Sequence, residues 1–243
     1  MERPFTVRSI FPRLPVVDEL SRREDVKGQV GVLHVLASVE RARQDTAQAL
    51  EYLRRALALC GQGGYRGGEA DIRHELGLLS MRSGNVEGAR IELTKAMDLY
   101  EAGEDSVGLC EALHALGSLA RMREQYEVCE AYQKRVLEIS RATKEPRGEA
   151  GATYELGCVA RQRGELAAAE VQLERALKLY RRIGHLVGQG GAHFELGQLR
   201  LARSQVQAAV RHFELSAALL RSAGDLHDLK VVEGELASLR ARK

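Results

Sequence analysis

The stretch ELGCVARQRGELAAA, residues 155–169, contains the pattern that decides the fold. Leu156 and Val159 lie three residues apart, which places both side chains on one stripe of an α-helix. The tetrapeptide QRGE then interrupts the apolar pattern, and the small residue Ala169 begins a second apolar stripe. We therefore predict two helices that are joined by a tight turn around Gly164.

This pattern recurs every 40 residues along the chain, without a gap. Three positions of the pattern form columns when the repeats are aligned. At the second of these positions glycine recurs, and its missing side chain lets a neighbouring helix approach closely. One such hairpin cannot bury its own apolar face, so neighbouring hairpins must stack on one another. The three columns that carry the pattern are Leu36, Leu76, Leu116, Leu156 and Leu196; then Ala37, Gly77, Gly117, Gly157 and Gly197; then Val39, Leu79, Leu119, Val159 and Leu199.

The period divides the chain into an arm, five hairpins and a terminal helix. The five predicted hairpins are residues 28–67, 68–107, 108–147, 148–187 and 188–227. Residues 228–243 are expected to form a capping helix. That helix should cover the last hairpin with Val231, Val232, Leu236 and Leu239, and present Lys230, Arg240, Arg242 and Lys243 to water.

Residues 1–27 do not fit the repeat. Pro4, Pro12 and Pro15 exclude a continuous helix there. Apolar residues such as Ile10 and Phe11 are nevertheless too frequent for a purely solvated tail. This N-terminal arm is expected either to cover the exposed edge of the first hairpin or to dock on a partner or on a second copy of the protein.

The columns resemble the tetratricopeptide repeat, in a 40-residue form with extended helices. The residues that carry the resemblance are ELGCVARQRGELAAA and, more loosely, HALGSLARMREQYEVC at residues 114–129. The resemblance implies an all-α fold, a right-handed α-solenoid of stacked helix-turn-helix hairpins. The sequence departs from the 34-residue form, because the closing proline is missing and the columns that carry bulky aromatics there hold Leu33, Arg73, Leu113, Thr153 and His193.

In arrays of this family the first helix of each repeat lines a concave face that takes a peptide or a partner helix. The resemblance therefore implies contact residues on the first helices. Offsets of four and seven residues place three columns on one helix face. These columns are His34, His74, His114, Tyr154 and Phe194; then Ser38, Leu78, Ser118, Cys158 and Gln198; then Arg41, Met81, Arg121, Arg161 and Leu201, with Arg82 beside them.

Rings that stack, next to arginines that grip carboxylates in pairs, would suit an acidic peptide or the C-terminus of a partner protein. Two alternatives remain open. The rings could fill space between neighbouring first helices, and arginines near a helix C-terminus complement the helix dipole, for roughly 0.3–1 kcal/mol each. Acidic residues such as Asp71, Glu75 and Glu111 lie near the same face, so its charge is mixed.

A metal, cofactor or catalytic site is not expected. The three histidines of the first column lie on successive first helices, which pack about 8–10 Å apart at best, whereas zinc needs its ligands about 2 Å from one ion. The four cysteines lack CxxC spacing, and no nucleophile motif occurs. The glycine-rich residues 60–69 lack the Lys followed by Ser or Thr that a phosphate loop needs. We interpret residues 61–67 as the connector between the first two hairpins, with a hinge there as the alternative.

The resemblance makes a protein-binding role the leading prediction, and the composition is compatible with it. A net charge of +2 does not favour nucleic acid, and no apolar run is long enough to span a bilayer. The N-terminus lacks the apolar stretch of a secretory signal, so a cytoplasmic protein is expected. We predict a non-enzymatic interaction scaffold or adaptor. A regulatory module that senses a ligand or peptide and a self-assembling protein that uses its arm are the alternatives.

Overall fold

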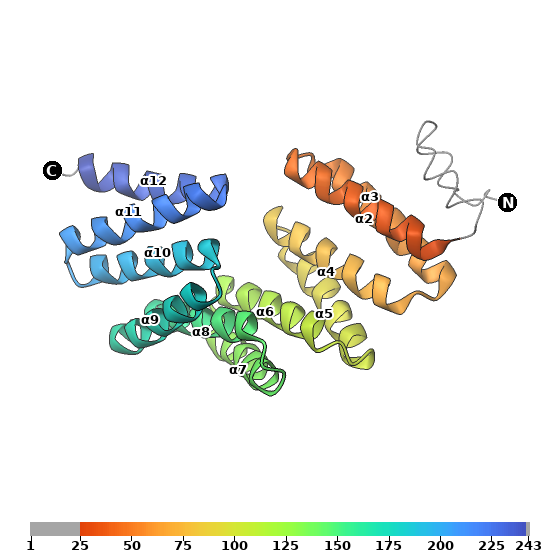
Figure 1. Ribbon diagram of the computed structural model, residues 1–243, viewed down its shortest axis with the longest axis horizontal. Coiled ribbons are helices and arrows are strands. Elements are labelled where there is room, and N and C mark those ends of the chain that lie inside the picture. Colours follow the sequence, from red (N-terminus) through yellow and green to blue (C-terminus); the bar gives the residue numbers. More distant parts are fainter. Residues whose placement is uncertain (1–24, 242–243) are drawn as a thin grey trace. The chain divides into compact units, whose positions relative to one another are not determined.

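The computed structural model describes residues 25–241 of the chain. The predictions for residues 1–24, Arg242 and Lys243 lie outside the described residues. Within residues 25–241 every regular element is an α-helix, so the predicted all-α class is confirmed (Figure 1). No helix in this range is long and apolar enough to cross a membrane.

The helices alternate between two kinds. The first helices of the hairpins are α2 (Val26–Ala42), α4 (Arg66–Arg82), α6 (Ser106–Met122), α8 (Pro146–Gln162) and α10 (Leu186–Ala202), and the lone terminal helix is α12 (Leu226–Ala241). The second helices are α3 (Thr46–Gly63), α5 (Val86–Ala102), α7 (Tyr126–Ala142), α9 (Leu166–Arg182) and α11 (Val206–Ala223). The chain divides into two compact units, and the boundary falls between Ala115 and Leu116, inside α6.

Between successive helices, from α2 onward, the backbone turns through one residue in the left-handed conformation. These residues are spaced by 20, at Gln44, Gly64, Gly84, Glu104, Glu124, Lys144, Gly164, Gly184, Ser204 and Gly224. Half of them are glycine, for which positive φ carries no steric cost. Several helices then begin at a polar residue that accepts a backbone N–H, as Asp25 does from Gly28 (2.9 Å) and Asp45 from Gln48 (3.0 Å).

The prediction that residues 61–67 form a loose connector is wrong. Helix α3 continues to Gly63 and α4 begins at Arg66, so Gly64 and Tyr65 are the whole connection. The neighbouring glycines permit close packing instead. A Cβ on Gly63 would lie 2.8 Å from the side chain of Val26, and a Cβ on Gly68 would lie 2.3 Å from the ring of Tyr65.

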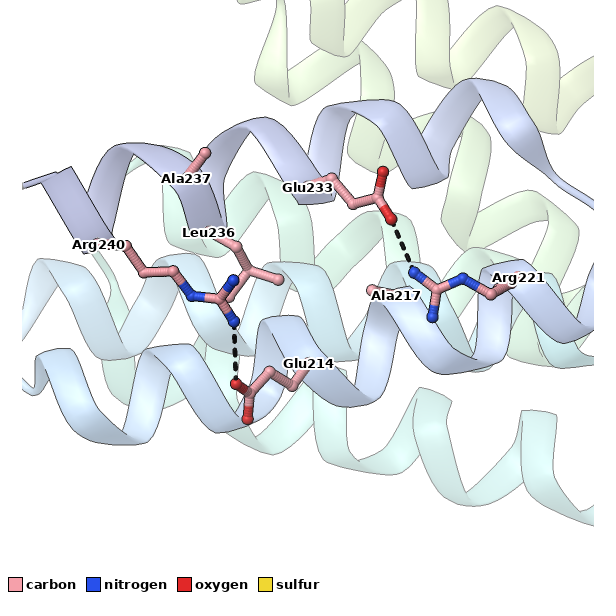
Figure 2. A pocket seen from close by; sticks show the side chains of 7 residues that line it. All are labelled: Glu214, Ala217, Arg221, Glu233, Leu236, Ala237 and Arg240. Carbon is pink, nitrogen blue, oxygen red and sulfur yellow. Dashed lines mark hydrogen bonds and ion pairs between the residues drawn. The ribbon is translucent and has the colours of Figure 1, made fainter.

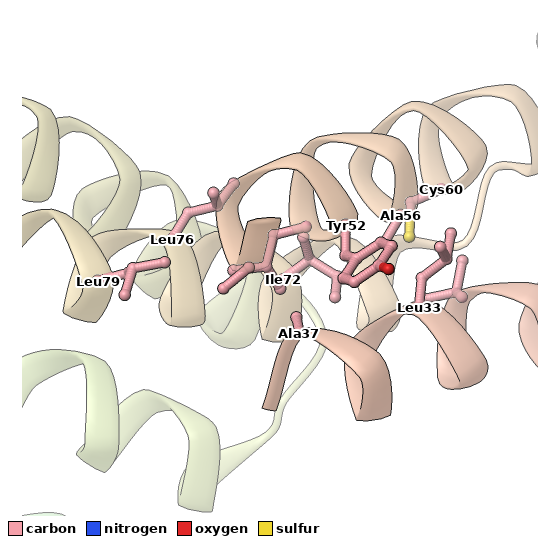
Figure 3. Packing of buried hydrophobic residues seen from close by; sticks show 11 residues of the cluster. Leu33, Ala37, Tyr52, Ala56, Cys60, Ile72, Leu76 and Leu79 are labelled. Atoms are coloured by element: carbon pink, nitrogen blue, oxygen red, sulfur yellow. The ribbon is translucent and has the colours of Figure 1, made fainter. Parts of the chain in front are cut away.

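Within each unit, hairpins stack through contacts of a first helix with the preceding second helix. In the first unit, Ile72, Leu76 and Leu79 of α4 share one buried cluster with Tyr52 and Ala56 of α3 (Figure 3). In the second unit, α10 packs on α9 and α12 packs on α11 in the same way. Val39 of α2 was also predicted to lie in the core, but it is 40% exposed, because no described hairpin precedes it.

The glycine column permits the two helices of a hairpin to approach closely. A Cβ on Gly77 would lie 2.5 Å from Leu93, one on Gly157 would lie 2.8 Å from Leu173, and one on Gly197 would lie 2.5 Å from Phe213. Those distances are too short for an unstrained contact. The close approach expected from the sequence is therefore confirmed.

Gly157→Ala is expected to destabilise the second unit by about 1–2 kcal/mol, because the added methyl group forces Leu173 out of its packed position. Gly234 of α12 is a matched control, since nothing lies within 4 Å of the position of its Cβ. There the better helix propensity of alanine should stabilise the protein by roughly 0.5–1 kcal/mol. Urea unfolding of both variants measures the effects. A Gly157→Ala variant as stable as the wild type would contradict the packing described for this column.

The terminal helix α12 covers α11 with four residues. Leu229, Val232, Leu236 and Leu239 are buried against the cluster that contains Phe213. The prediction for Val231 is wrong, because this side chain is 49% exposed. Successive residues of a helix point about 100° apart, so Val231 cannot share the stripe of Val232.

Candidate interaction face

The predicted contact residues lie on the first helices, in two separate groups. The group in the first unit comprises His34, Arg41, His74, Arg82 and His114, and the group in the second unit comprises Ser118, Arg121, Tyr154, Cys158, Arg161, Phe194 and Gln198. Arg82 is exposed and most of the others are half-buried. We refer to the second group, without Cys158, as the interaction face.

The predicted arginine row is paired within the protein. Each of three arginines bonds a glutamate located 34 residues further on, which lies on the next first helix. The pairs are Arg41 Nη1 to Glu75 Oε2 (3.3 Å), Arg121 Nε to Glu155 Oε2 (2.7 Å) and Arg161 Nε to Glu195 Oε2 (2.5 Å). At the equivalent positions between α4 and α6 both charges are absent, since Met81 and Ala115 occupy them. At the equivalent positions on α10 and α12 only the arginine is absent, since Leu201 stands 34 residues before Glu235.

Glu155 is the most fully engaged of these carboxylates. Its side chain is 5% exposed, and it also accepts a hydrogen bond from Ser118 Oγ (3.0 Å). Burial by itself lowers the pKa of Arg121, but the charge and hydrogen bond of Glu155 outweigh that effect and raise the pKa above its ordinary value. Arg121 therefore stays charged near neutral pH, and its pair with Glu155 fastens α8 to α6 within the second unit.

The Arg161–Glu195 pair is expected to contribute about 1–2 kcal/mol to stability, since both groups are largely buried and mutually hydrogen-bonded. Arg161→Met, Glu195→Gln and the double variant form a thermodynamic cycle that isolates this term. The exposed pair Arg221–Glu233 (2.7 Å) is the control, and its cycle should give under about 1 kcal/mol. If the coupling of the first pair were no larger than that of the control, its structural role would be disproved.

The rings of the face rest on the second helices. Tyr154 packs edge-on against Tyr180 with centroids 6.3 Å apart, and Phe194 packs against Phe213 at 5.5 Å. The predicted alternative placed these rings between neighbouring first helices, whereas these two contacts are with second helices. Both residues nevertheless remain partly rather than fully buried, although burial raises the pKa of the Tyr154 hydroxyl well above its ordinary value.

His74 in the first unit also packs against a second helix. Its ring meets that of Tyr100 edge-on at 6.4 Å, and Tyr100 donates its hydroxyl hydrogen to Asp71 (2.9 Å). Burial lowers the pKa of His74, although Glu111, Glu75 and Asp71 oppose that effect. His74 is therefore mainly neutral near pH 7.

Cys158 must be removed from the predicted contact residues. Its side chain is completely buried in the cluster formed by α8, α9 and α10. Burial, followed by the charges of Glu195 and Glu155, raises the pKa of its thiol well above the ordinary value. A ligand on the surface of the first helices does not reach this sulfur, and the thiol is not activated.

A histidine pair that the sequence did not indicate joins α10 to α11. The Nδ1 atoms of His193 and His212 lie 3.0 Å apart, so one nitrogen must donate the hydrogen and the other accept it. Arg181 lies 3.4 Å from the other nitrogen of His193. Burial, then the positive charges of His212 and Arg181, lower the pKa of His193 to about 4. Within residues 25–241 no group of three or more metal-binding side chains comes together.

A cavity of about 470 Å³ lies between α11 and α12, away from the interaction face (Figure 2). Leu236, Ala217 and Ala237 form its apolar part. Arg221 pairs with Glu233 and Arg240 with Glu214 across its mouth, so its charges are already compensated.

Comparison with known families identifies the repeat. Two family models described as tetratricopeptide repeat match the sequence, one over residues 31–62 and the other over residues 108–182. The chain is a tetratricopeptide-repeat protein. The helical-repeat fold predicted from the 40-residue period is therefore confirmed. A comparison with curated proteins found no match.

Solved structures share the fold of this tetratricopeptide-repeat protein. Aspartyl phosphate phosphatase F from Bacillus subtilis is 14% identical, with a TM-score of 0.72 over 95% of this chain and 61% of that chain. The Rap conjugation gene regulator of the plasmid pLS20, solved with the Phr* peptide, is 15% identical, with a TM-score of 0.72 over 95% of this chain and 62% of that one. This chain thus spans about three fifths of the length of either relative.

A third structure, pilF of Pseudomonas aeruginosa, matches over nearly its full length. It is 21% identical, with a TM-score of 0.59 over 89% of this chain and 91% of that chain. At these identities the likeness is one of fold, and a shared fold does not fix a function.

Proposed function

We propose that this tetratricopeptide-repeat protein is an interaction scaffold that binds a peptide or helix of a partner protein on its first helices. The observation that carries the proposal is the build of the interaction face. Half-buried Tyr154, Phe194 and Gln198 lie on first helices that ion pairs hold together, α6 to α8 and α8 to α10. Such a surface is preorganised, so a ligand loses little affinity to ordering it.

The chemistry of the face points to a ligand with apolar side chains. Arg121 and Arg161 already have carboxylate partners in the structure. An acidic segment would have to displace Glu155 or Glu195, which would leave a buried charge without its partner. We therefore propose contacts of the Tyr154 and Phe194 rings with apolar groups, and hydrogen bonds from Gln198 to the ligand backbone. This replaces the acidic ligand expected from the sequence.

A variant that blocks the face tests the proposal. Gln198→Trp places a bulky ring on the face, whereas Val171→Trp places the same ring on α9, where the side chain is 64% exposed and faces away from the helix core. Each protein would be used to capture proteins from the lysate of its source, and bound proteins would be identified by mass spectrometry. We expect one partner to be retained by the wild type and Val171→Trp and lost by Gln198→Trp.

The outcome also decides between the scaffold and its alternatives. Equal capture by all three proteins would place binding away from this face. A peptide-sensing role draws support from the pLS20 regulator, which was solved with a bound peptide. In that case small-angle scattering should change when a peptide derived from the captured partner is added, whereas a passive scaffold would leave the curve unchanged.

A further inference from the structure

The first helices bury a repeated apolar stripe against the preceding second helix. We call this the leading stripe, and its members are spaced by four and three residues. On α4 it is buried against α3, on α10 against α9, and on α12 against α11. The three stripes are Ile72, Leu76 and Leu79; Ala192, Leu196 and Leu199; and Val232, Leu236 and Leu239.

On α2 the end of the leading stripe lacks this cover, although Val32 and Leu36 are partly buried and Leu36 packs against the cluster of α2, α3 and α4. The equivalent residues are Val32, Leu36 and Val39, and Val39 is 40% exposed where Leu79 is 5% and Leu199 is 0% exposed. Val35 beside it is 64% exposed. Val35 occupies the column in which Glu75, Glu155 and Glu195 accept a hydrogen bond from the preceding repeat.

The change from glutamate to valine identifies the cover as apolar. A glutamate would be expected at position 35 if the face met water or an arginine, as at the later positions. Two exposed valines one turn apart, Val35 and Val39, instead indicate a surface that another apolar segment covers. A neighbouring segment of the same chain reaches such a surface at an effective concentration of about millimolar or more, because the link to it is short.

We propose that residues 10–20 of the protein cover the leading stripe of α2. The 40-residue spacing of the repeat supports the choice of this segment. Counting back 40 residues from Ala56, Leu57 and Cys60, which pack in the cluster between α3 and α4, leads to Val16, Val17 and Leu20. All three are apolar, and Leu20 is joined to α2 by only the few residues before Asp25.

The direction of the chain assigns each part of the segment to a part of α2. Two segments joined by a short turn run antiparallel. The residues of one segment that lie near the turn therefore contact the residues of the other segment that lie near the turn. Val16 to Leu20 would therefore cover Val32 near the start of α2, and Ile10 and Phe11 would cover Val39 near its end.

Photo-crosslinking in the full-length protein tests the assignment. Val39→p-benzoylphenylalanine places the crosslinker on the leading stripe, and Val171→p-benzoylphenylalanine places it on the exposed surface of α9 as the control. After irradiation of a dilute sample and trypsin digestion, we expect the monomer band to contain a cross-link from position 39 to the peptide of residues 9–13 or of residues 14–22, and none from position 171. Cross-links found only in a dimer band, or only to other peptides, would overturn the proposal in favour of a second copy or another cover.

Hydrogen exchange provides an independent test. Val35→Asp with Val39→Asp should leave the helices intact, since both side chains are exposed in the structure. Amides of residues 14–22 should exchange at least about tenfold faster in this variant than in the wild type, because the apolar contact that protects them is lost. Equal exchange in the two proteins, with circular dichroism unchanged, would contradict the proposal.

Discussion

Leu173→Asp is expected to abolish folding of the hairpins α8–α9 and α10–α11. Leu173 is completely buried, and its cluster contains Cys158, Leu196 and Leu199. A carboxylate at this position would be buried without a partner, which costs more than about 4 kcal/mol together with the lost apolar contacts. That penalty is close to the whole stability of a typical domain, which is about 5–15 kcal/mol.

Circular dichroism during thermal and urea unfolding measures this effect. Val171→Asp is the matched control, because Val171 lies on the same helix two residues away and is 64% exposed. Its stability should stay within about 0.5 kcal/mol of the wild type. A Leu173→Asp protein with a wild-type melting temperature would refute the position assigned to this stripe.

Acidification is expected to weaken the second unit through the His193–His212 pair. The pKa of His193 is about 4 in the folded protein, compared with about 6.5 for a free histidine. Between these values the unfolded protein binds more protons than the folded one. The contribution of His193 to the free energy of unfolding is therefore fully present above pH 6.5. This contribution is lost as the pH drops toward 4, and the loss amounts to about 3 kcal/mol in all.

Urea unfolding between pH 7.5 and pH 5 isolates this contribution from other titrating groups. His193→Gln keeps a hydrogen-bonding side chain but removes the titration, so its stability should fall by about 2 kcal/mol less than that of the wild type over this range. His227→Gln, on the exposed side of α12, is expected to follow the wild-type profile. Parallel curves for wild type and His193→Gln would show that this histidine is not protected from protonation in the fold.

Much of the fold could be predicted because the repeat makes its physical causes visible. A leucine every 40 residues with glycine beside it has one simple explanation, which is close packing of two helices, and Gly157 on Leu173 bears this out. The turns at Gly84 and Gly164 also followed from the sequence. Their equivalents at Gln44, Glu124 and Ser204 did not, since these residues adopt positive φ only where the flanking helices impose it.

The glycine-rich residues 60–69 show why composition alone gave a wrong prediction at one point. Glycine permits both a flexible backbone and close packing against a neighbouring side chain. Only the structure shows that Gly63 and Gly68 permit close packing here. Val231 was assigned to the core because it is apolar, although its neighbour Val232 occupies the buried position. Both errors come from reading residue type without the helix phase.

The face was predicted in part. Its position on the first helices followed from column spacing, and Tyr154, Phe194 and Gln198 lie half-buried there. The arginine–glutamate pairs join columns of successive repeats, and the sequence carried no consistent signal of them, because both charges are absent at Met81 and Ala115 whereas Leu201 stands before Glu235. The His193–His212 contact had no such signal, because both histidines occur in one repeat only.

The most direct test of the scaffold function is amide hydrogen exchange of the protein with and without the segment of the captured partner. We predict slower exchange in α8 and α10, which carry Tyr154, Phe194 and Gln198, with little change in α9 and α11. The Val171→Trp protein should show the same protection, and the Gln198→Trp protein should show none. Protection confined to α9, α11 or α12 would contradict the account, because the partner would then bind the second helices or the terminal helix rather than the first-helix face.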